Sequence, residues 1–473
     1  MYQPTEKQLS LNLFPKQLII ESNEWYHLER IMPWYEIENI MEGLFSNVGR
    51  NAIPVRQIIG ALIIQTKLGL TDRDTLIFIQ LTPMFQYFLG LPDYTPQELF
   101  DYTLLCKYRK IIGIDIAKEM IETLLTTNKV IIKKINFNIT HQGTMSIDAT
   151  VAPVNITYPT DLKLLNTVRE QTESIIDACY EKSNLTVKPR TYRKEARTVY
   201  LKYAKAKRLS KEKRFSANRM QLQYIDRNLK TIETHVNQAV FVLTDDQIEY
   251  LKICKTIYNQ QYGMWQNKVN RVDDRIVNFH QPHIRGIVRG KAGTNIEFGP
   301  KIEINKVDGY ITIDKISFHN FNEGKTLIEA IQSYHQRHGV YPVNVNADKI
   351  YQTRENKQYC KELEIRLSGP KLGRKKTEDT TDKAIERIDF KKRLEIEGVF
   401  GVAKSKYGLS KLFTKLPESQ RVSIGLIFFV MNLMQIHHKV SFYEKLEMYI
   451  LMIIESDMTY AYEDEILNLQ NVE

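Results

Sequence analysis

Apolar residues recur at the spacing of helices through the first part of the chain. Val55 and Ile58 begin one such series, which follows a proline and continues with apolar positions three and four residues apart. The polar stretch 69–74 interrupts the series and supplies the start of a new helix, with Asp74 at the capping-box position. The pattern therefore predicts several short helices within residues 1–125.

Short runs with the character of strands follow this helical part. They cover residues 144–151, 302–305, 310–313, 343–348 and 365–367. The second and third runs flank Asp308 and Gly309, a dipeptide typical of a two-residue hairpin turn. The resulting order is strand, hairpin, helix, strand, helix, strand, helix. This order predicts an α/β domain of the RNase H-like class with a mixed five-stranded sheet.

A long helical and strongly charged segment separates the first strand from the others. We expect it to be an insertion between the first and second strands, which makes the chain mostly helical overall. The predicted organisation is an all-α N-terminal domain at 1–125, an RNase H-like α/β domain at 140–154 and 284–412, a basic helical insertion at 155–283, and C-terminal helices at 413–473.

Three carboxylates fall at the ends or edges of these elements. Asp148 lies inside the first strand, where aspartate is disfavoured, and Asp348 ends a strand that can run parallel to it. Glu397 enters on a helix that we expect to pack across the sheet. Parallel neighbours would bring the two aspartates to one sheet edge, about 5 Å apart. The alternative for Asp148 is an ordinary aspartate at a strand end that caps a turn.

Three converging carboxylates would repel one another unless cations neutralise them. Hard oxygen ligands suit Mg²⁺ or Mn²⁺. Two such ions about 4 Å apart can activate a water or a 3′-hydroxyl and stabilise the leaving oxygen of a phosphodiester. Gly398 and Gly401 directly follow the glutamate, and glycine permits close approach by another backbone or a ligand.

The segment 390–407 has the spacing of one helix with a charged stripe. Arg393 and Glu397 lie four residues apart, and Lys404 returns to the same face about three turns after Arg393. Glu395 points to the other side of this helix. Spacing therefore favours Glu397 over Glu395 as the carboxylate that does chemistry. The alternative is a solvated helix that carries ion pairs.

Charge indicates the class of partner. The formal net charge is +10 and the pI about 9.1, which favours a polyanion such as nucleic acid. Residues 188–219 are dense in Lys and Arg and predict a long basic helix on a phosphate backbone, with a solvated helical hairpin as the alternative. The DNA-contacting candidates outside 390–407 are Arg193, Arg197, Lys205, Arg208, Arg289 and Lys291.

Other features narrow the class of protein. The four cysteines lie far apart and form no cluster with histidines, which argues against zinc. The first residues do not have the pattern of a secretory signal. The longest apolar run, 422–434, is too short to cross a bilayer and is predicted to be a buried helix. We therefore expect a cytoplasmic protein without a membrane partner.

The charged helix resembles a known signature. Its Arg393, Glu397 and Lys404 have the spacing of the Tyr-Arg-Glu-Lys signature of DDE transposases from bacterial insertion sequences, with Phe390 where that signature has Tyr. The strings at 147–153, 158–162, 397–401 and 407–409 also resemble this family. The stretch 59–91 resembles the helical N-terminal domain of these transposases, which favours DNA binding over oligomerisation alone for residues 1–125.

The resemblance implies an activity and its residues. Asp148, Asp348 and Glu397 would be the DDE triad that holds two Mg²⁺ or Mn²⁺ ions, and Arg393 and Lys404 would hold DNA near the cleaved bond. The enzyme would cut double-stranded DNA at the terminal inverted repeats of its element and join the 3′-hydroxyls to target DNA. A homodimer on DNA, associated with the bacterial nucleoid, is expected. The alternatives are a transposase-derived DNA-binding regulator without catalysis and a metal-dependent DNA nuclease.

Overall fold

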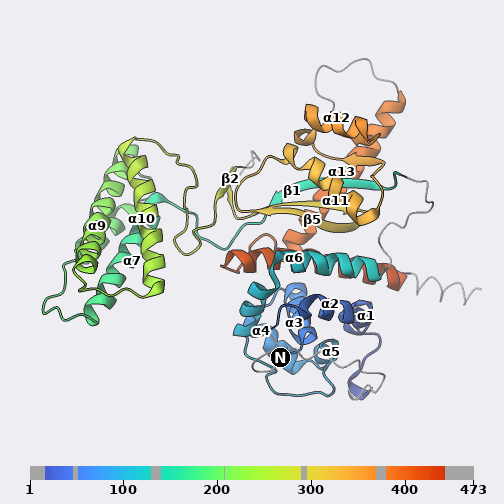
Figure 1. Cartoon of the computed structure of the whole chain (residues 1–473), viewed down its shortest axis with the longest axis horizontal. Helices are drawn as coiled ribbons and strands as arrows, with labels where there is room; N and C mark the ends of the chain where they lie inside the picture. The colour runs from blue at the N-terminus through green and yellow to red at the C-terminus, as the bar shows by residue number, and fades with distance from the viewer. Residues whose placement is uncertain are drawn as a thin grey trace, which may run out of the picture.

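Helices form the N-terminal part of the chain. The computed structural model describes residues 16–45, 52–128, 140–206, 208–288, 296–368 and 380–442. The 3-10 turn η1 (Lys16–Leu18) comes first. The helices that follow are α1 (Glu24–Ile31), α2 (Trp34–Glu42), α3 (Val55–Leu68), α4 (Asp72–Leu81), α5 (Pro83–Phe88) and α6 (Thr103–Thr127) (Figure 1). Gly69 ends α3 with a left-handed φ of 68°, and the Thr71 hydroxyl accepts a hydrogen bond from the Asp74 N–H at 3.1 Å. The predicted break and cap are thus confirmed.

A mixed sheet of five strands lies beside these helices. Its order is β5-β4-β1-β6-β7, formed by β1 (Thr144–Val151), β4 (Lys301–Val307), β5 (Tyr310–Ser317), β6 (Asn344–Asn346) and β7 (Arg366–Ser368). The pairs β5·β4 and β4·β1 are antiparallel, whereas β1·β6 and β6·β7 are parallel. The predicted hairpin turn is present, since Asp308 and Gly309 both have positive φ, at 50° and 92°. A separate ribbon pairs β2 (Gly286–Val288) with β3 (Ile296–Phe298).

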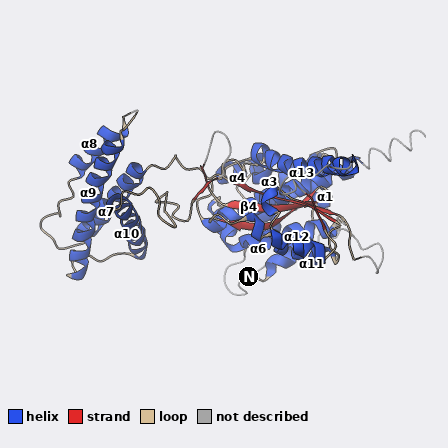
Figure 2. Cartoon of the chain, turned by 90° about the horizontal axis from the view of Figure 1, so that it is seen from above, coloured by secondary structure: helices blue, strands red, loops and turns tan. Residues whose placement is uncertain are grey.

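Helices cover both faces of this sheet (Figure 2). They include α11 (Leu327–His338), α12 (Arg354–Glu362) and α13 (Thr380–Lys406), with the 3-10 turns η2 (Glu323–Lys325) and η3 (Lys349–Tyr351) before α11 and α12. Alternate residues of β1 point to opposite faces. Met145 and Ile147 share a buried cluster with Leu327 of α11, whereas Ile396 of α13 packs in the cluster that contains Ile304.

The helical segment between β1 and β4 forms a module with its own core. It contains α7 (Asp161–Glu181), α8 (Arg193–Ala204), α9 (Lys211–Asn237) and α10 (Asp245–Gln266), and it stands to one side of the sheet (Figure 1). Two buried apolar clusters hold these helices together. The prediction of one long basic helix over 188–219 is wrong. The helix is interrupted between α8 and α9 because Ser210 caps α9, accepting a hydrogen bond from the Lys213 N–H at 3.3 Å.

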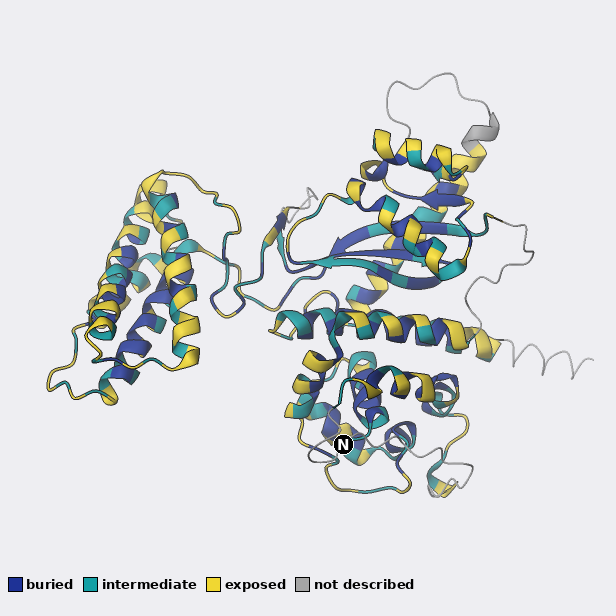
Figure 3. Ribbon diagram, in the orientation of Figure 1, coloured by how far each residue is buried: buried dark blue, intermediate teal, exposed yellow. Residues whose placement is uncertain are grey.

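The helix Pro417–Phe442 joins the two halves of the core. Buried residues are concentrated in the strands and on the inner faces of the helices that pack on them (Figure 3), and one apolar cluster runs from the N-terminal helices through this helix to the sheet. At Gly425 a Cβ would come within 2.7 Å of the Ala117 side chain of α6, so glycine permits the close packing. Asn432 is fully buried and bonds both the N–H and the C=O of Ile311 on β5.

The helix Pro417–Phe442 is longer than the apolar run 422–434 from which it was predicted. It has 26 residues and is, among the described residues, the one helix long and apolar enough to cross a membrane by length and composition. The run 422–434 alone is too short, but its helix extends beyond it at both ends. Within the 18-residue apolar window, 78% is buried inside the protein. The predicted buried helix is therefore present.

Candidate active site

Asp148 is half-buried in the centre of the sheet. It lies on β1 between the antiparallel partner β4 and the parallel partner β6, and its Oδ1 accepts a hydrogen bond from the Ala149 N–H at 2.8 Å. Burial is the largest cause that raises the pKa of the Asp148 carboxyl, and the carboxylates of Glu323, Asp348 and Glu397 contribute to the rise, so that the pKa is about 6 despite the lowering effect of that hydrogen bond. Asp148 is therefore an acid that the fold holds in an unfavourable place for its charge.

Asp348 follows the end of the neighbouring parallel strand. Because Ser146 is in register with Asn346, the next pair of side chains on the same face belongs to positions 148 and 348. The Asp348 carboxylate caps η3, accepting a hydrogen bond from the Lys349 N–H at 2.7 Å. Both aspartates thus lie just past the C-terminal end of the parallel β1·β6 pairing, at one edge of the sheet.

Glu397 comes to this edge from α13. Its residue is exposed, and its charge is among those that raise the Asp148 pKa, which places the two carboxylates within electrostatic reach. Glu395 instead contacts β4, where its carboxylate accepts a hydrogen bond from Lys306 Nζ at 2.9 Å. At Gly398 and Gly401 an added Cβ would meet nothing within 4 Å in the described protein, so the expected close backbone approach is absent there.

Arg393 pairs with an acid other than the one that its spacing favours. Its Nη1 donates to Asp348 Oδ1 at 3.1 Å, and within the described residues no ion pair joins it to Glu397. The Phe390 ring supports this arginine, with its centroid 5.4 Å from the guanidinium carbon. Lys404 is half-buried and lies about three turns after Arg393 on α13. Arg393 therefore reaches from α13 to the residue that caps the turn after β6.

Two further carboxylates in this part of the sheet were not anticipated from the sequence. Glu323, at the start of η2, forms an ion pair with Lys301 of β4 at 2.8 Å, and its effect on the Asp148 pKa ranks above those of Asp348 and Glu397. Glu303 is 1% exposed, and burial raises its pKa to about 7. The available signal in the sequence was the position of Glu303 between Ile302 and Ile304 of a strand, where a carboxylate is disfavoured.

Hydrogen bonds connect Glu303 to the loop that carries Asp348. Glu303 Oε1 accepts from Tyr351 Oη at 2.8 Å and from Thr326 Oγ1 at 2.5 Å. Tyr351 is fully buried and ends η3, the turn that Asp348 caps. The other oxygen of Glu303 is buried and has no partner among the described atoms. This network fixes the turn after β6 against β4.

The donor set suits a hard divalent cation, although its present arrangement is open. Carboxylate oxygens are the ligands that Mg²⁺ and Mn²⁺ prefer, and a cation would offset both the burial of the Asp148 charge, which is the largest cause of its raised pKa, and the smaller effect of the neighbouring carboxylates. Among the described residues, however, no group of three or more His, Cys, Asp or Glu is gathered closely enough to hold one ion. Arg393 neutralises part of the Asp348 charge in this arrangement.

The candidate DNA contacts fall into three groups. Arg197, Lys205 and Arg208 are exposed on α8 and on the connection to α9. Arg193 is exposed too, but both of its terminal nitrogens donate to the Asp177 carboxylate, at 2.9 and 2.6 Å. The candidates Arg289 and Lys291 lie outside the described residues.

One basic residue of the N-terminal helices has a structural role. Lys107, Arg109 and Lys110 lie close together in sequence on α6. Arg109 is 3% exposed and forms an ion pair with Asp72, so it holds α6 to α4 and does not face solvent.

Two family models match parts of the chain. The model described as "Transposase DDE domain" matches residues 345–434, and the model described as "Transposase domain (DUF772)" matches residues 14–111. The first match contains Asp348, Arg393, Glu397 and Lys404, whereas Asp148 and the module α7–α10 lie outside both. No curated protein and no solved structure matches the chain significantly. The two matches support a DNA transposase function in general.

The pKa of Asp148 generates a prediction about stability. A carboxyl whose pKa is higher in the folded state than in the unfolded state stabilises the fold below the unfolded pKa, here 3.8, and this stabilisation is lost as pH rises through about 6. We expect Asp148→Asn, studied in chelator, to be more stable than the unsubstituted protein above pH 6, by about 1–2 kcal/mol after allowance for solvent screening. Below pH 3.8 the two proteins should unfold alike.

Chemical denaturation at both ends of this pH range measures the difference. Glu395→Gln is the matched control, since it removes a carboxylate of the neighbouring helix that is 58% exposed. Equal stability of Asp148→Asn and unsubstituted protein above pH 6 would show that the fold does not disfavour the Asp148 charge through burial and neighbouring carboxylates.

Proposed function

We propose that this protein is a DDE transposase of a bacterial insertion sequence, of the group with the Tyr-Arg-Glu-Lys signature. It cuts DNA at the ends of its element and joins the freed 3′-hydroxyls to target DNA. The observation that supports the proposal is that Asp348 follows the strand paired in parallel with the strand of Asp148 and that the charge of Glu397 acts on Asp148, with Asp348 and Glu397 inside the segment that matches the transposase DDE domain. The fold class that we propose for this domain is RNase H-like.

The reaction conserves the number of phosphodiester bonds in its joining step. Hydrolysis at an element end breaks one P–O3′ bond while the oxygen of water forms a new P–O bond, which leaves a 3′-hydroxyl and a 5′-phosphate. That oxygen then attacks a phosphorus atom of target DNA, and one P–O bond forms as another breaks. Divalent ions, when bound, lower the pKa of the attacking hydroxyl or water and stabilise the leaving oxygen.

The residues of this chain have separate tasks in the proposal. Asp148, Asp348 and Glu397 would hold two Mg²⁺ or Mn²⁺ ions. Arg393 keeps Asp348 neutralised before the ions bind, through the ion pair at 3.1 Å, and is then available for a DNA phosphate. Lys404, on the same helix, would contact DNA near the cleaved bond. Tyr351 and Glu303 hold the turn that carries Asp348 in place.

The remaining parts bind and position DNA in this account. We assign residues 1–125 to DNA binding and oligomerisation, 140–154 with 284–412 to catalysis, 155–283 to backbone contact, and 413–473 to C-terminal helices. Both element ends must be held together, so the active form is a homodimer on double-stranded DNA. Its place of action is the nucleoid in the bacterial cytoplasm.

One observation favours a second function. The ion pair between Arg393 and Asp348 and the open arrangement of the carboxylates fit a transposase-derived regulator that binds DNA without catalysis. Cleavage of DNA separates the two functions. A strand-transfer assay with a pre-cleaved end that carries a 3′-hydroxyl distinguishes the transposase from a metal-dependent nuclease, which cuts but does not join.

The first prediction for this function concerns the three acids. Asp148→Asn, Asp348→Asn and Glu397→Gln each remove a ligand charge with little change in shape, so each should lower the rate of Mg²⁺-dependent cleavage of a labelled element end by at least about a hundredfold. Binding of DNA through the basic surfaces should persist. Glu395→Gln, whose carboxylate pairs with Lys306, is the control that should cut normally. Normal cleavage by all three variants would rule out the proposed metal site.

A second prediction concerns the exposed cations of the helical module. Replacing Arg197, Lys205 and Arg208 together by Ala should weaken DNA binding and reduce the slope of log K against log salt by up to about 2.7, since each phosphate contact contributes about 0.9. Arg193→Ala should have a smaller effect because Asp177 already neutralises that guanidinium. Fluorescence anisotropy at several salt concentrations measures both. An unchanged slope in the triple variant would make this surface a solvated one.

A further inference from the structure

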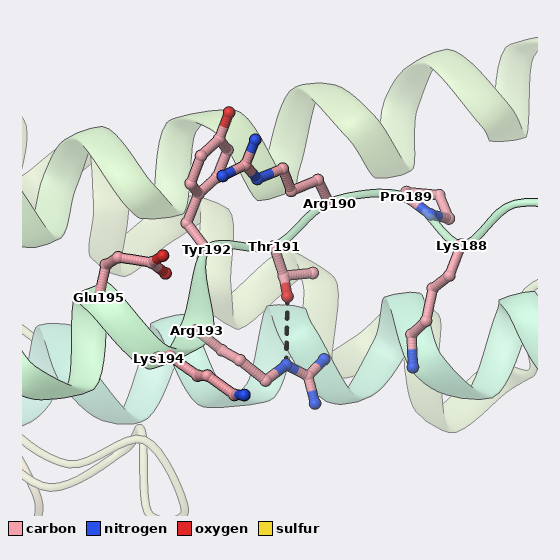
Figure 4. A pocket seen from close by; sticks show the side chains of 8 residues that line it. All are labelled: Lys188, Pro189, Arg190, Thr191, Tyr192, Arg193, Lys194 and Glu195. Atoms are coloured by element: carbon pink, nitrogen blue, oxygen red, sulfur yellow. Dashed lines mark hydrogen bonds between the residues drawn. The ribbon is translucent and has the colours of Figure 1, made fainter.

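Two arginines from different elements stack on one tyrosine of the helical module. The guanidinium carbon of Arg190, in the loop before α8, lies 4.2 Å from the centroid of the Tyr192 ring. The guanidinium carbon of Arg227, on α9, lies 5.2 Å from the same centroid and 5.6 Å from that of Tyr224. Figure 4 shows the Arg190 side chain crossing the Tyr192 ring at the edge of a cleft lined by residues 188–195.

The two stacked arginines differ from Lys188 and Arg193 in having no acidic partner among the described residues. Lys188 and Arg193, in the same loop and at the start of α8, both form ion pairs with Asp177, at 2.8 and 2.6 Å. Arg190 and Arg227 are exposed, and within the described part of the chain neither has a carboxylate within 4.0 Å. Asp177 thus neutralises Lys188 and Arg193, whereas the charges of Arg190 and Arg227 stay available for a ligand.

The backbone around Tyr192 is held in a defined shape. Tyr192 has a φ of 54°, in the left-handed region that bulky residues rarely adopt. Thr191 is buried, and its hydroxyl accepts a hydrogen bond from Arg193 Nε at 3.1 Å (Figure 4). The Tyr192 carbonyl accepts from the Ala196 N–H, and the Ala196 carbonyl in turn accepts from Gln221 of α9. These bonds fix the loop to α9, which also carries Arg227.

We propose that Arg190 and Arg227, held in place by Tyr192, form a site for the phosphates of a DNA duplex. A guanidinium presents a planar fork that matches phosphate oxygens, and stacking on an aromatic ring restricts its motion before binding. Less side-chain entropy is then lost when a phosphate is bound. The ring is already engaged by two cations and does not offer itself to a base. The site therefore binds the backbone without reading sequence.

This inference rests on the proposed function only in taking DNA as the partner. The site lies in the module α7–α10, which is outside both matched transposase segments and stands to one side of the sheet (Figure 1). It would hold DNA at a distance from the cleaved bond. Its test needs no cleavage and no knowledge of the element ends.

The experiment measures the salt dependence of binding to a mixed-sequence DNA duplex. The full chain is compared with the double variant Arg190→Ala/Arg227→Ala by fluorescence anisotropy. Loss of two phosphate contacts should reduce the slope of log K against log salt by about 1.8 and weaken binding on the order of tenfold at moderate salt. The reduction should be the same for duplexes of different sequence.

The control removes the same formal charge from the same module. Lys230 and Lys255 are exposed and pair with Asp226 and Glu233, at 2.8 and 3.7 Å, so Lys230→Ala/Lys255→Ala should leave the slope unchanged. A second variant, Arg190→Lys/Arg227→Lys, keeps both charges but loses the planar fork. It should keep the slope and bind more weakly than the unsubstituted chain, and it serves as the test of the site if the alanine variant does not fold.

The outcomes separate the site from the general function. If the unsubstituted chain does not bind duplex DNA, the proposed function fails with its partner. If it binds and the alanine variant has an unchanged slope, only the arginine site is wrong. Lysine variants that bind as tightly as the unsubstituted chain would refute the role of stacking, and an effect confined to one DNA sequence would refute backbone recognition.

Discussion

The parallel pairing of β1 with β6 is the constraint on which the candidate site depends. Its register sets Ser146 opposite Asn346 and so carries Asp148 and Asp348 to one edge of the sheet. Like charges at such an edge repel, and burial, as the largest cause, together with the neighbouring carboxylates raises the Asp148 pKa to about 6. The hydrogen bond from the Ala149 N–H to Asp148 and the ion pair of Arg393 with Asp348 act against this unfavourable arrangement.

The compensation comes from three separate elements. Arg393 of α13 neutralises Asp348, Lys301 of β4 neutralises Glu323, and the buried Glu303 binds the hydroxyl of Tyr351 at the end of the turn that Asp348 caps. The site is thus held by contacts within the sheet and across α13 and not by the acids themselves. Under the proposed function, a divalent cation bound at this edge would offset the repulsion among these carboxylates.

Local patterns predicted much of the fold because they depend on neighbouring residues alone. The hairpin at Asp308 and Gly309, the cap at Thr71 and the helix over 390–407 are all present. The predicted strand before Asp348 pairs in parallel with β1, as expected from the order of elements, although it ends at Asn346. The assignment of Asp148, Asp348 and Glu397 to a metal site stays a prediction, as do the domain boundaries.

Contacts between distant segments could not be predicted in this way. Helical spacing paired Arg393 with Glu397, but the docking of α13 on the sheet brings Asp348 closer to that guanidinium. The influence of Glu323 on Asp148 depends on the path of the chain after β5, which no local pattern reports. The break at Ser210 was readable as a helix cap, and it was missed because the density of charge over 188–219 suggested continuity.

The most direct test of the account is the binding of Mn²⁺ by the full chain, followed by the electron paramagnetic resonance signal of the free ion above pH 6, where Asp148 is ionised. The unsubstituted protein should take up Mn²⁺, and Glu397→Gln should take up less with weaker affinity. Uptake should also fall below the Asp148 pKa. Identical Mn²⁺ binding by Glu397→Gln and the unsubstituted protein would contradict the claim that the carboxylates at this sheet edge form one metal site.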